Sequence, residues 1–220
     1  AGRTAIVTGA AHGLGREIVV RLASRGARVH AWDLLEEEVA ATARLGDDFE
    51  PGRITARVVD VTDTGAVDAA TGDVVVSGGG LHVLVNCAGG VLRQVGRPVE
   101  EVSRDDFDAI VAVNLTGVFN TVRAAAPTMK AAGLGRVVNI SSGAGLGVSK
   151  TGIQAYAAAK AGQIGLTRQL AHELGQFGIT VNCVAPGFVR SNPATERQWE
   201  AYGAEGQRAL VEGIALRRLG

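Results

Sequence analysis

Short β-branched runs alternate with longer helix-like stretches along almost the whole chain. The runs are candidate strands at 4–8, 28–33, 53–61, 82–86, 136–141 and 179–185. The stretches between them, near 14–25, 36–45, 63–76, 104–131 and 154–176, carry apolar residues at spacings of three and four in several cases. Strands that are almost continuously apolar and alternate with helices are typical of a parallel sheet buried on both faces. The sequence therefore predicts an α/β fold: a doubly wound, Rossmann-type parallel sheet in an α/β/α arrangement.

Composition narrows the class of protein. A chain of 220 residues with 46% hydrophobic residues predicts one domain, 1–220, with a large core. Lys+Arg and Asp+Glu are both 22, so no binding of nucleic acid or of acidic membranes is expected. Cys87 and Cys183 lie in apolar, strand-like segments, which favours buried thiols in a reducing compartment. No apolar run approaches the length of a membrane span, so we expect a cytoplasmic protein.

The first candidate strand is followed by the glycine-rich segment "TGAAHGLG" at 8–15. Gly9, Gly13 and Gly15 permit a tight turn into a helix that begins near Leu14, and they let backbone N–H groups approach a pyrophosphate. The spacing differs from the more familiar G-x-G-x-x-G, and a glycine-rich turn without a ligand is the alternative. The strand-to-helix context favours a dinucleotide.

The second candidate strand ends in Asp33, 24 residues after Gly9 (33 − 9). Folds of this class place an acid near this point on the adenosine ribose hydroxyls, and an acid repels a 2′-phosphate. Leu34 and Leu35 carry no positive charge, so NAD is favoured over NADP, although His12 leaves an opening for the phosphate. The alternative role for Asp33 is the N-cap of the following helix.

Three further strand ends carry polar residues. Asp60 follows the third strand and is either a ligand contact or a turn residue. Asn86 opens "NCAGG" after the fourth strand, and Ser142 follows the fifth in "NISS", where a hydroxyl could meet a substrate or serve a turn. No metal site is expected.

"YAAAK" at 156–160 places Tyr156 and Lys160 one helical turn apart, on the same face. A free tyrosine has a pKa near 10, and a neighbouring ammonium favours the phenolate by lowering that pKa. The alternative is an inward tyrosine on an alanine-rich helix with a lysine in water.

Taken together, these motifs carry a family resemblance. "TGAAHGLG", "NCAG", Asn114 in "NLTGVF", "NISS", "YAAAK" and "APG" at 185–187 occur in the order and spacing of the classical short-chain dehydrogenases/reductases. The chain resembles that family from about residue 3 to 220. The resemblance implies that Tyr156 is the general acid or base, that Lys160 supplies charge and binds the nicotinamide ribose, and that Ser142 orients the substrate oxygen. Asn114 would hold a water in a proton relay, and Ser141 is the second candidate serine.

The resemblance also implies a cofactor site. Gly9, Gly13 and Gly15, with His12 and Leu14 between them, would face the pyrophosphate, and Asp33 the adenosine ribose. The remaining expected contacts follow in chain order: Asp60 and Val61 at the adenine, Asn86, Ala88 and Gly89 along the cofactor wall, and Pro186, Gly187 and Val189 at the nicotinamide, beside Tyr156 and Lys160.

The function so implied is NAD(H)-dependent hydride transfer between a secondary alcohol and a ketone. A 3-oxoacyl thioester reductase using NADPH and a non-catalytic NAD-responsive binding protein are the alternatives; an epimerase or dehydratase fits the glycine spacing less well. The segment 188–219 resembles the mobile substrate loop of the family, whose Arg190, Trp199, Tyr202 and Arg208 would contact a ligand or cover the cleft. Arg93 and Gln94 are also expected to border the substrate pocket.

Family members usually continue with a further helix and a seventh strand, which we expect to be absent from this chain. By analogy with the family, the protein would be a homo-oligomer, either a dimer or a tetramer.

Overall fold

The computed structural model describes residues 2–50, 52–92, 94, 96–149 and 151–220. Their six strands form one sheet in the order β3-β2-β1-β4-β5-β6, and every pair is parallel. The strands are β1 (Thr4–Thr8), β2 (Arg28–Asp33), β3 (Ile54–Val58), β4 (Val83–Asn86), β5 (Gly135–Ile140) and β6 (Ile179–Val184). The strand order reverses between β1 and β4, and ligands of such sheets bind beyond the carboxyl ends at this switch point.

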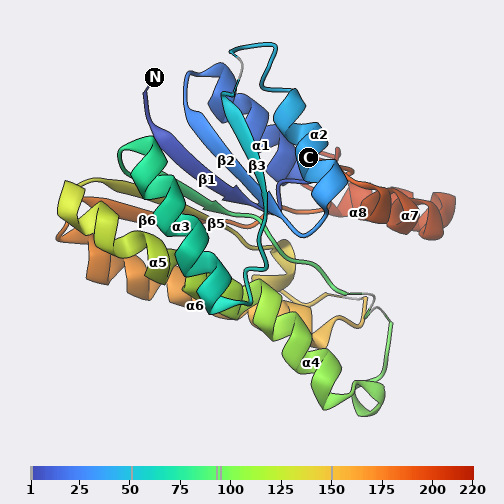
Figure 1. Ribbon diagram of the computed structural model, residues 1–220. Helices are drawn as coiled ribbons and strands as arrows, with labels where there is room; N and C mark the ends of the chain where they lie inside the picture. The colour runs from blue at the N-terminus through green and yellow to red at the C-terminus, as the bar shows by residue number, and fades with distance from the viewer. Residues whose placement is uncertain (1, 51, 93, 95, 150) are drawn as a thin grey trace.

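Helices cover both faces of the sheet (Figure 1). α1 (Gly13–Ser24) and α2 (Glu36–Arg44) lie on one face, and α3 (Thr64–Gly78), α5 (Gly117–Ala132) and α6 (Gln154–Gly175) lie on the other. Two apolar clusters match this division, one around Val19 and Val39 and the other around Trp32, Val122 and Leu174. The predicted doubly wound α/β/α fold is confirmed.

The helix expected over 104–131 is interrupted. It consists of α4 (Arg104–Val111), a π-helical turn η2 (Ala112–Thr116) and α5. The helical stretch Arg104–Ala132 is long enough to cross a bilayer and contains an 18-residue window that is apolar enough to do so, a property that the core helices of soluble proteins share. Here α5 packs against β4, β5 and α3.

The segment 188–219, which resembles the substrate loop of the family, is mostly helical, and its contact with a substrate stays a prediction. It forms α7 (Pro193–Ala201) and α8 (Gly203–Gly213), which extend to the right in Figure 1. The side chain of Asn192 accepts hydrogen bonds from the backbone N–H groups of Ala194 and Thr195, and Pro193 occupies the first turn. This capping box and the proline favour a helix start at this point. The third strand also ends earlier than expected, at Val58.

Candidate active site

The turn between β1 and α1 forms the cradle that the sequence predicts for a dinucleotide. Gly9 has a φ of 68°, and a Cβ there would lie 2.6 Å from the backbone N of Ala88, so no larger residue fits. The N-cap residue of α1, His12, makes no side-chain cap, and the first turn holds no acid. The first-turn N–H groups therefore remain available to an anion, and the residues fit a pyrophosphate.

Thr8 is a site residue that sequence reasoning missed. Its Oγ1 accepts hydrogen bonds from the N–H groups of Cys87 (3.2 Å) and Ala88 (3.1 Å), which begin the segment after β4. This contact joins the two strand ends at the switch point. The available signal was the position of Thr8 directly before Gly9, at the start of the glycine-rich segment.

Asp33 lies at the end of β2, against the glycine loop. Its Oδ2 accepts a hydrogen bond from Ala11 N (2.9 Å), and its Oδ1 accepts from Leu34 N (2.8 Å) and Leu35 N (3.2 Å). The N-cap residue of α2 is Leu35, so the alternative in which Asp33 caps this helix is wrong. Asp33 instead fixes the position of the loop relative to the strand end.

Asp60 and Val61 lie beyond β3. The Asp60 carboxylate accepts hydrogen bonds from the N–H and hydroxyl of Thr62, which is the geometry of a turn residue. Val61 is buried, and its carbonyl accepts a hydrogen bond from Asn120 Nδ2 (3.0 Å).

Tyr156 and Lys160 lie together on α6, as predicted. Lys160 Nζ is 5.6 Å from the centroid of the Tyr156 ring and donates a 2.8 Å hydrogen bond to the carbonyl oxygen of Ile140, at the end of β5. The Lys160 side chain is not in water, because the residue is only 3% exposed. The alternative of a solvent-exposed lysine is therefore wrong.

The two serines after β5 have different surroundings. Ser141 is buried, and its Oγ donates a 2.9 Å hydrogen bond to the Lys160 carbonyl, which anchors α6. Ser142 is half-buried, interacts with the Tyr156 side chain, and accepts a hydrogen bond from Ala144 N (3.2 Å). The geometry brings Ser142, and not Ser141, to the Tyr156 side chain.

Asn114 lies in the π-helical turn η2 and is fully buried. Its Nδ2 donates to the carbonyls of Gly90 and Ile110, both at 2.9 Å, and its Oδ1 accepts from Gly90 N (3.1 Å). A Cβ on Gly89 would collide with Asn114 Oδ1 and lie 3.5 Å from Lys160 Nζ. Gly89 thus lies between the two side chains, and the segment after β4 is fixed against η2.

Burial dominates the electrostatics of this group. It raises the pKa of Tyr156, an effect that the Ser142 side chain opposes, so the expected lowering of this pKa by Lys160 is not found. Burial lowers the pKa of Lys160 to about 8. It also raises the pKa of Cys87 to about 11, which keeps this neighbouring thiol neutral.

A buried polar network runs below the strand ends. Asn86 Nδ2 donates to Asn139 Oδ1 (2.8 Å), and Asn139 Nδ2 donates to Thr167 Oγ1 (2.9 Å) on α6. Asn86 Oδ1 also accepts from the hydroxyl of Thr121 on α5 (2.7 Å). The network connects β4, β5 and both helices beneath the candidate site, so Asn86 has a structural role here.

The segment after β6 lies over the glycine loop. The carbonyl of Pro186 accepts a 2.8 Å hydrogen bond from Gly143 N, and a Cβ on Gly13 would lie 3.2 Å from Ser191 Oγ. Ser191 is thus a second neighbour of the loop that sequence reasoning missed. A Cβ on Gly187 would meet nothing within 4 Å, and a Cβ on Gly220 would lie 3.2 Å from Val189.

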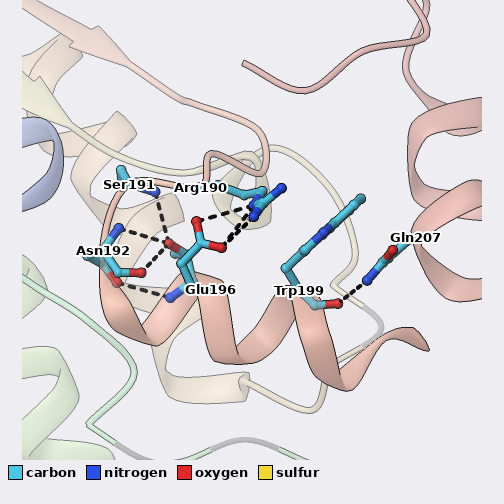
Figure 2. A network of polar contacts seen from close by, with 7 residues as sticks. Arg190, Ser191, Asn192, Glu196, Trp199 and Gln207 are labelled. Atoms are coloured by element: carbon cyan, nitrogen blue, oxygen red, sulfur yellow. Dashed lines mark hydrogen bonds and ion pairs between the residues drawn. The ribbon is translucent and has the colours of Figure 1, made fainter. Parts of the chain in front are cut away.

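Figure 2 shows how α7 is held together. Arg190 forms an ion pair with Glu196 (2.6 Å) and lies over the Trp199 ring, with its guanidinium carbon 5.4 Å from the centroid. Phe188 stacks on Trp199 and packs against Tyr202. Arg208 is exposed, Gln94 is buried, and Arg93 lies outside the described residues. The described part of the chain contains no His, Cys, Asp and Glu group suited to a metal ion.

Lys160→Met is expected to stabilise the protein at neutral pH. Because the pKa of Lys160 is about 8 in the folded protein and 10.5 normally, the unfolded chain binds more protons between these values. This group therefore makes the free energy of unfolding rise with pH through that window. Removing it should eliminate the rise and stabilise the protein at pH 7 by up to about 3 kcal/mol, measured by urea denaturation.

Lys130→Met is the matched control, because Lys130 lies nearer the surface, 3.8 Å from Glu173. The control should keep the wild-type pH profile. Superimposable profiles for Lys160→Met and the wild type would contradict this account.

The chain is similar to known proteins over most of its length. The sequence model of a family described as short chain dehydrogenase matches residues 3–201. A cyclohexanol dehydrogenase from Rhodococcus sp. (strain TK6) is 37% identical, with 100% of this chain and 84% of that protein covered.

Two solved structures share the fold and bind different nicotinamide cofactors. An NAD+-bound xylitol dehydrogenase has a TM-score of 0.88 and 28% identity, over 100% of this chain and 87% of that one. An actinorhodin polyketide ketoreductase with NADPH has a TM-score of 0.89 and 32% identity, over 99% and 85%.

Proposed function

Because the chain belongs to the short-chain dehydrogenase family, an oxidoreductase family that binds nicotinamide cofactors, we propose that it transfers a hydride between NAD(H) and a secondary alcohol or ketone. The observation that carries this proposal is the buried Lys160 ammonium beside Tyr156, beyond the carboxyl end of β5. The cradle between β1 and α1 supports it at the neighbouring strand end.

Tyr156 exchanges a proton with the substrate oxygen in this proposal. Its raised pKa keeps the phenol protonated at neutral pH, so it is ready to donate a proton to a carbonyl as the alcohol forms. Ser142 hydrogen-bonds the same oxygen. When bound, the nicotinamide supplies or accepts the hydride.

Lys160 stabilises the tyrosinate that remains after this proton transfer. With a pKa of about 8, its ammonium is mostly charged at neutral pH, and its position over the ring brings this charge close to Tyr156. In the reverse direction the same ammonium favours the phenolate that accepts the proton of an alcohol. Asn114 would hold a water in a relay toward Lys160, through which a proton from solvent restores the Tyr156 phenol.

The cofactor preference is proposed from Asp33, whose carboxylate repels a 2′-phosphate. Asp33→Ala together with Leu34→Arg is expected to shift the NADPH-to-NADH affinity ratio by about tenfold or more. Since Asp33 also holds Ala11 N, overall affinity should fall, so the ratio and not either constant is the measurement. Asp33→Ala alone is the control for lost loop contacts, and an unchanged ratio in the double variant would contradict this role.

The substrate class needs a direct test. A 3-oxoacyl-[acyl-carrier-protein] reductase from Thermotoga maritima is 37% identical, over 89% of this chain and 77% of that protein, which favours a 3-oxoacyl thioester reductase as the second candidate. The likeness to a polyketide ketoreductase with NADPH favours NADPH as its cofactor. Fluorescence titration with NADH and NADPH should precede assays with ketones, oxidised sugars and 3-oxoacyl thioesters. Turnover of a simple ketone with NADH supports the proposal, and turnover of thioesters alone with NADPH supports the second candidate. Binding without any turnover favours a non-catalytic NAD-responsive protein.

Further expectations about assembly, location and partners belong to the proposal. Family analogy favours a homo-oligomer, a dimer or tetramer, and the two free thiols, Cys87 and Cys183, together with the composition favour a cytoplasmic location. The partner is a small molecule, and no nucleic acid or membrane is involved.

A further inference from the structure

A cluster of polar contacts lies behind the glycine loop, between α1 and α2. Arg16 Nε donates a 2.9 Å hydrogen bond to the hydroxyl of Thr42, and its Nη2 donates to the carbonyls of Ala11 and, at 3.3 Å, Glu38. Thr42 is fully buried, and its Oγ1 lies 2.9 Å from the Ala10 carbonyl. The side chains of Arg16 and Thr42 therefore hydrogen-bond the carbonyls of Ala11 and Ala10 on the side of the loop that faces α2.

The N–H groups of Ala10 and Ala11 both donate to residues of β2. Ala10 N donates to the Trp32 carbonyl (3.1 Å), and Ala11 N donates to Asp33 Oδ2 (2.9 Å). All four backbone polar groups of Ala10 and Ala11 thus have protein partners. A carbonyl turned toward a bound pyrophosphate would repel it, and these contacts prevent that orientation.

Arg16 also brings a positive charge to the glycine loop. Among the residues that the structure describes, its guanidinium forms no ion pair, whereas Arg21, one and a half turns along α1, pairs with Glu17. The hydrogen-bond partners of Arg16 are a hydroxyl and backbone carbonyls, which carry no net charge. Its positive charge therefore adds to that of the α1 N-terminus.

We propose that Arg16 and Thr42 are positioning residues for the pyrophosphate of the dinucleotide: they hold the carbonyls of Ala10 and Ala11 away from the anion, and Arg16 supplies positive charge behind the loop. This inference rests on the proposed function, because it assumes that a dinucleotide binds at α1. The affinity for the anion, and not the chemical step, is the property that these residues set.

Calorimetric titration with ADP-ribose, which carries the pyrophosphate without the nicotinamide, tests the proposal. Arg16→Met should weaken binding by about tenfold at low salt, and the difference from wild type should shrink as salt is added. Arg16→Lys keeps the charge but loses the planar fork, so it should recover part of the affinity. Thr42→Val should weaken binding less, because the charge remains.

Arg21→Met is the matched control, since it makes the same change on the same helix at an exposed ion pair. Circular dichroism establishes that each variant is folded at the assay temperature. Wild-type affinity in Arg16→Met, or an equal loss in Arg21→Met, would overturn the positioning role while leaving the proposed function intact. Failure of the wild-type protein to bind ADP-ribose would overturn both.

Discussion

Tyr156→Phe is expected to reduce kcat by about 10²–10⁴-fold, the range that general acid–base catalysis contributes. The substitution removes only the phenolic oxygen, so the ring beneath Lys160 Nζ is retained. NADH affinity should therefore change little, as measured by fluorescence titration alongside steady-state turnover. The loss would assign the proton transfer to this hydroxyl.

Tyr202→Phe is the matched control, because the chain contains only two tyrosines. The Tyr202 hydroxyl accepts a hydrogen bond from Gln198 Nε2 (2.8 Å). Gln198 lies in α7, and Tyr202 is the C-cap residue of that helix. Its removal should have a far smaller effect on kcat. If Tyr156→Phe turned over substrate at the wild-type rate, the proposed mechanism would be wrong.

Gly15→Ala is expected to destabilise the protein by about 3 kcal/mol or more, although alanine normally favours a helix. A Cβ at Gly15 would collide with the Gly9 carbonyl oxygen, a backbone atom of the tight turn that cannot rotate away. The collision should also displace the loop and weaken NADH binding. Urea denaturation and cofactor titration measure the two effects.

Gly72→Ala provides the opposite case in α3. Gly72 is exposed, and a Cβ there would meet nothing within 4 Å. This variant should stabilise the protein by about 0.5–1 kcal/mol, the ordinary gain from alanine in a helix. Equal effects of the two substitutions would show that the close approach of α1 to the turn does not govern stability.

The fold was predictable because its signals are local. Each strand run lies near its observed position, and Thr8, Asp33 and Asn86 come to one edge of the sheet because parallel strands end together. The helix start at Asn192 also has a local signal, an N-cap residue followed by Pro193.

The surroundings of individual side chains were not predictable in this way. Ser141 and Ser142 are adjacent and identical, and only the position of α6 makes one an anchor and the other a neighbour of Tyr156. The pKa of Lys160 depends on burial by elements from distant parts of the chain. Arg16 could not be predicted as a site residue, because its partners lie in other elements: Ala11 in the glycine loop and Thr42 in α2.

The asparagine pair beneath the site has a consequence for how the chain finds its strand alignment. Val137 and Val138 are identical neighbours in β5, so packing alone distinguishes poorly between the native pairing with β4 and one shifted by a residue. A shift would turn Asn139 to the opposite face and leave the Asn86 amide buried without its partner, at a cost of about 1–3 kcal/mol. The hydrogen bond between Asn86 and Asn139 thus favours the native register of β4 and β5. This register is also the one that brings the candidate site residues at the strand ends together.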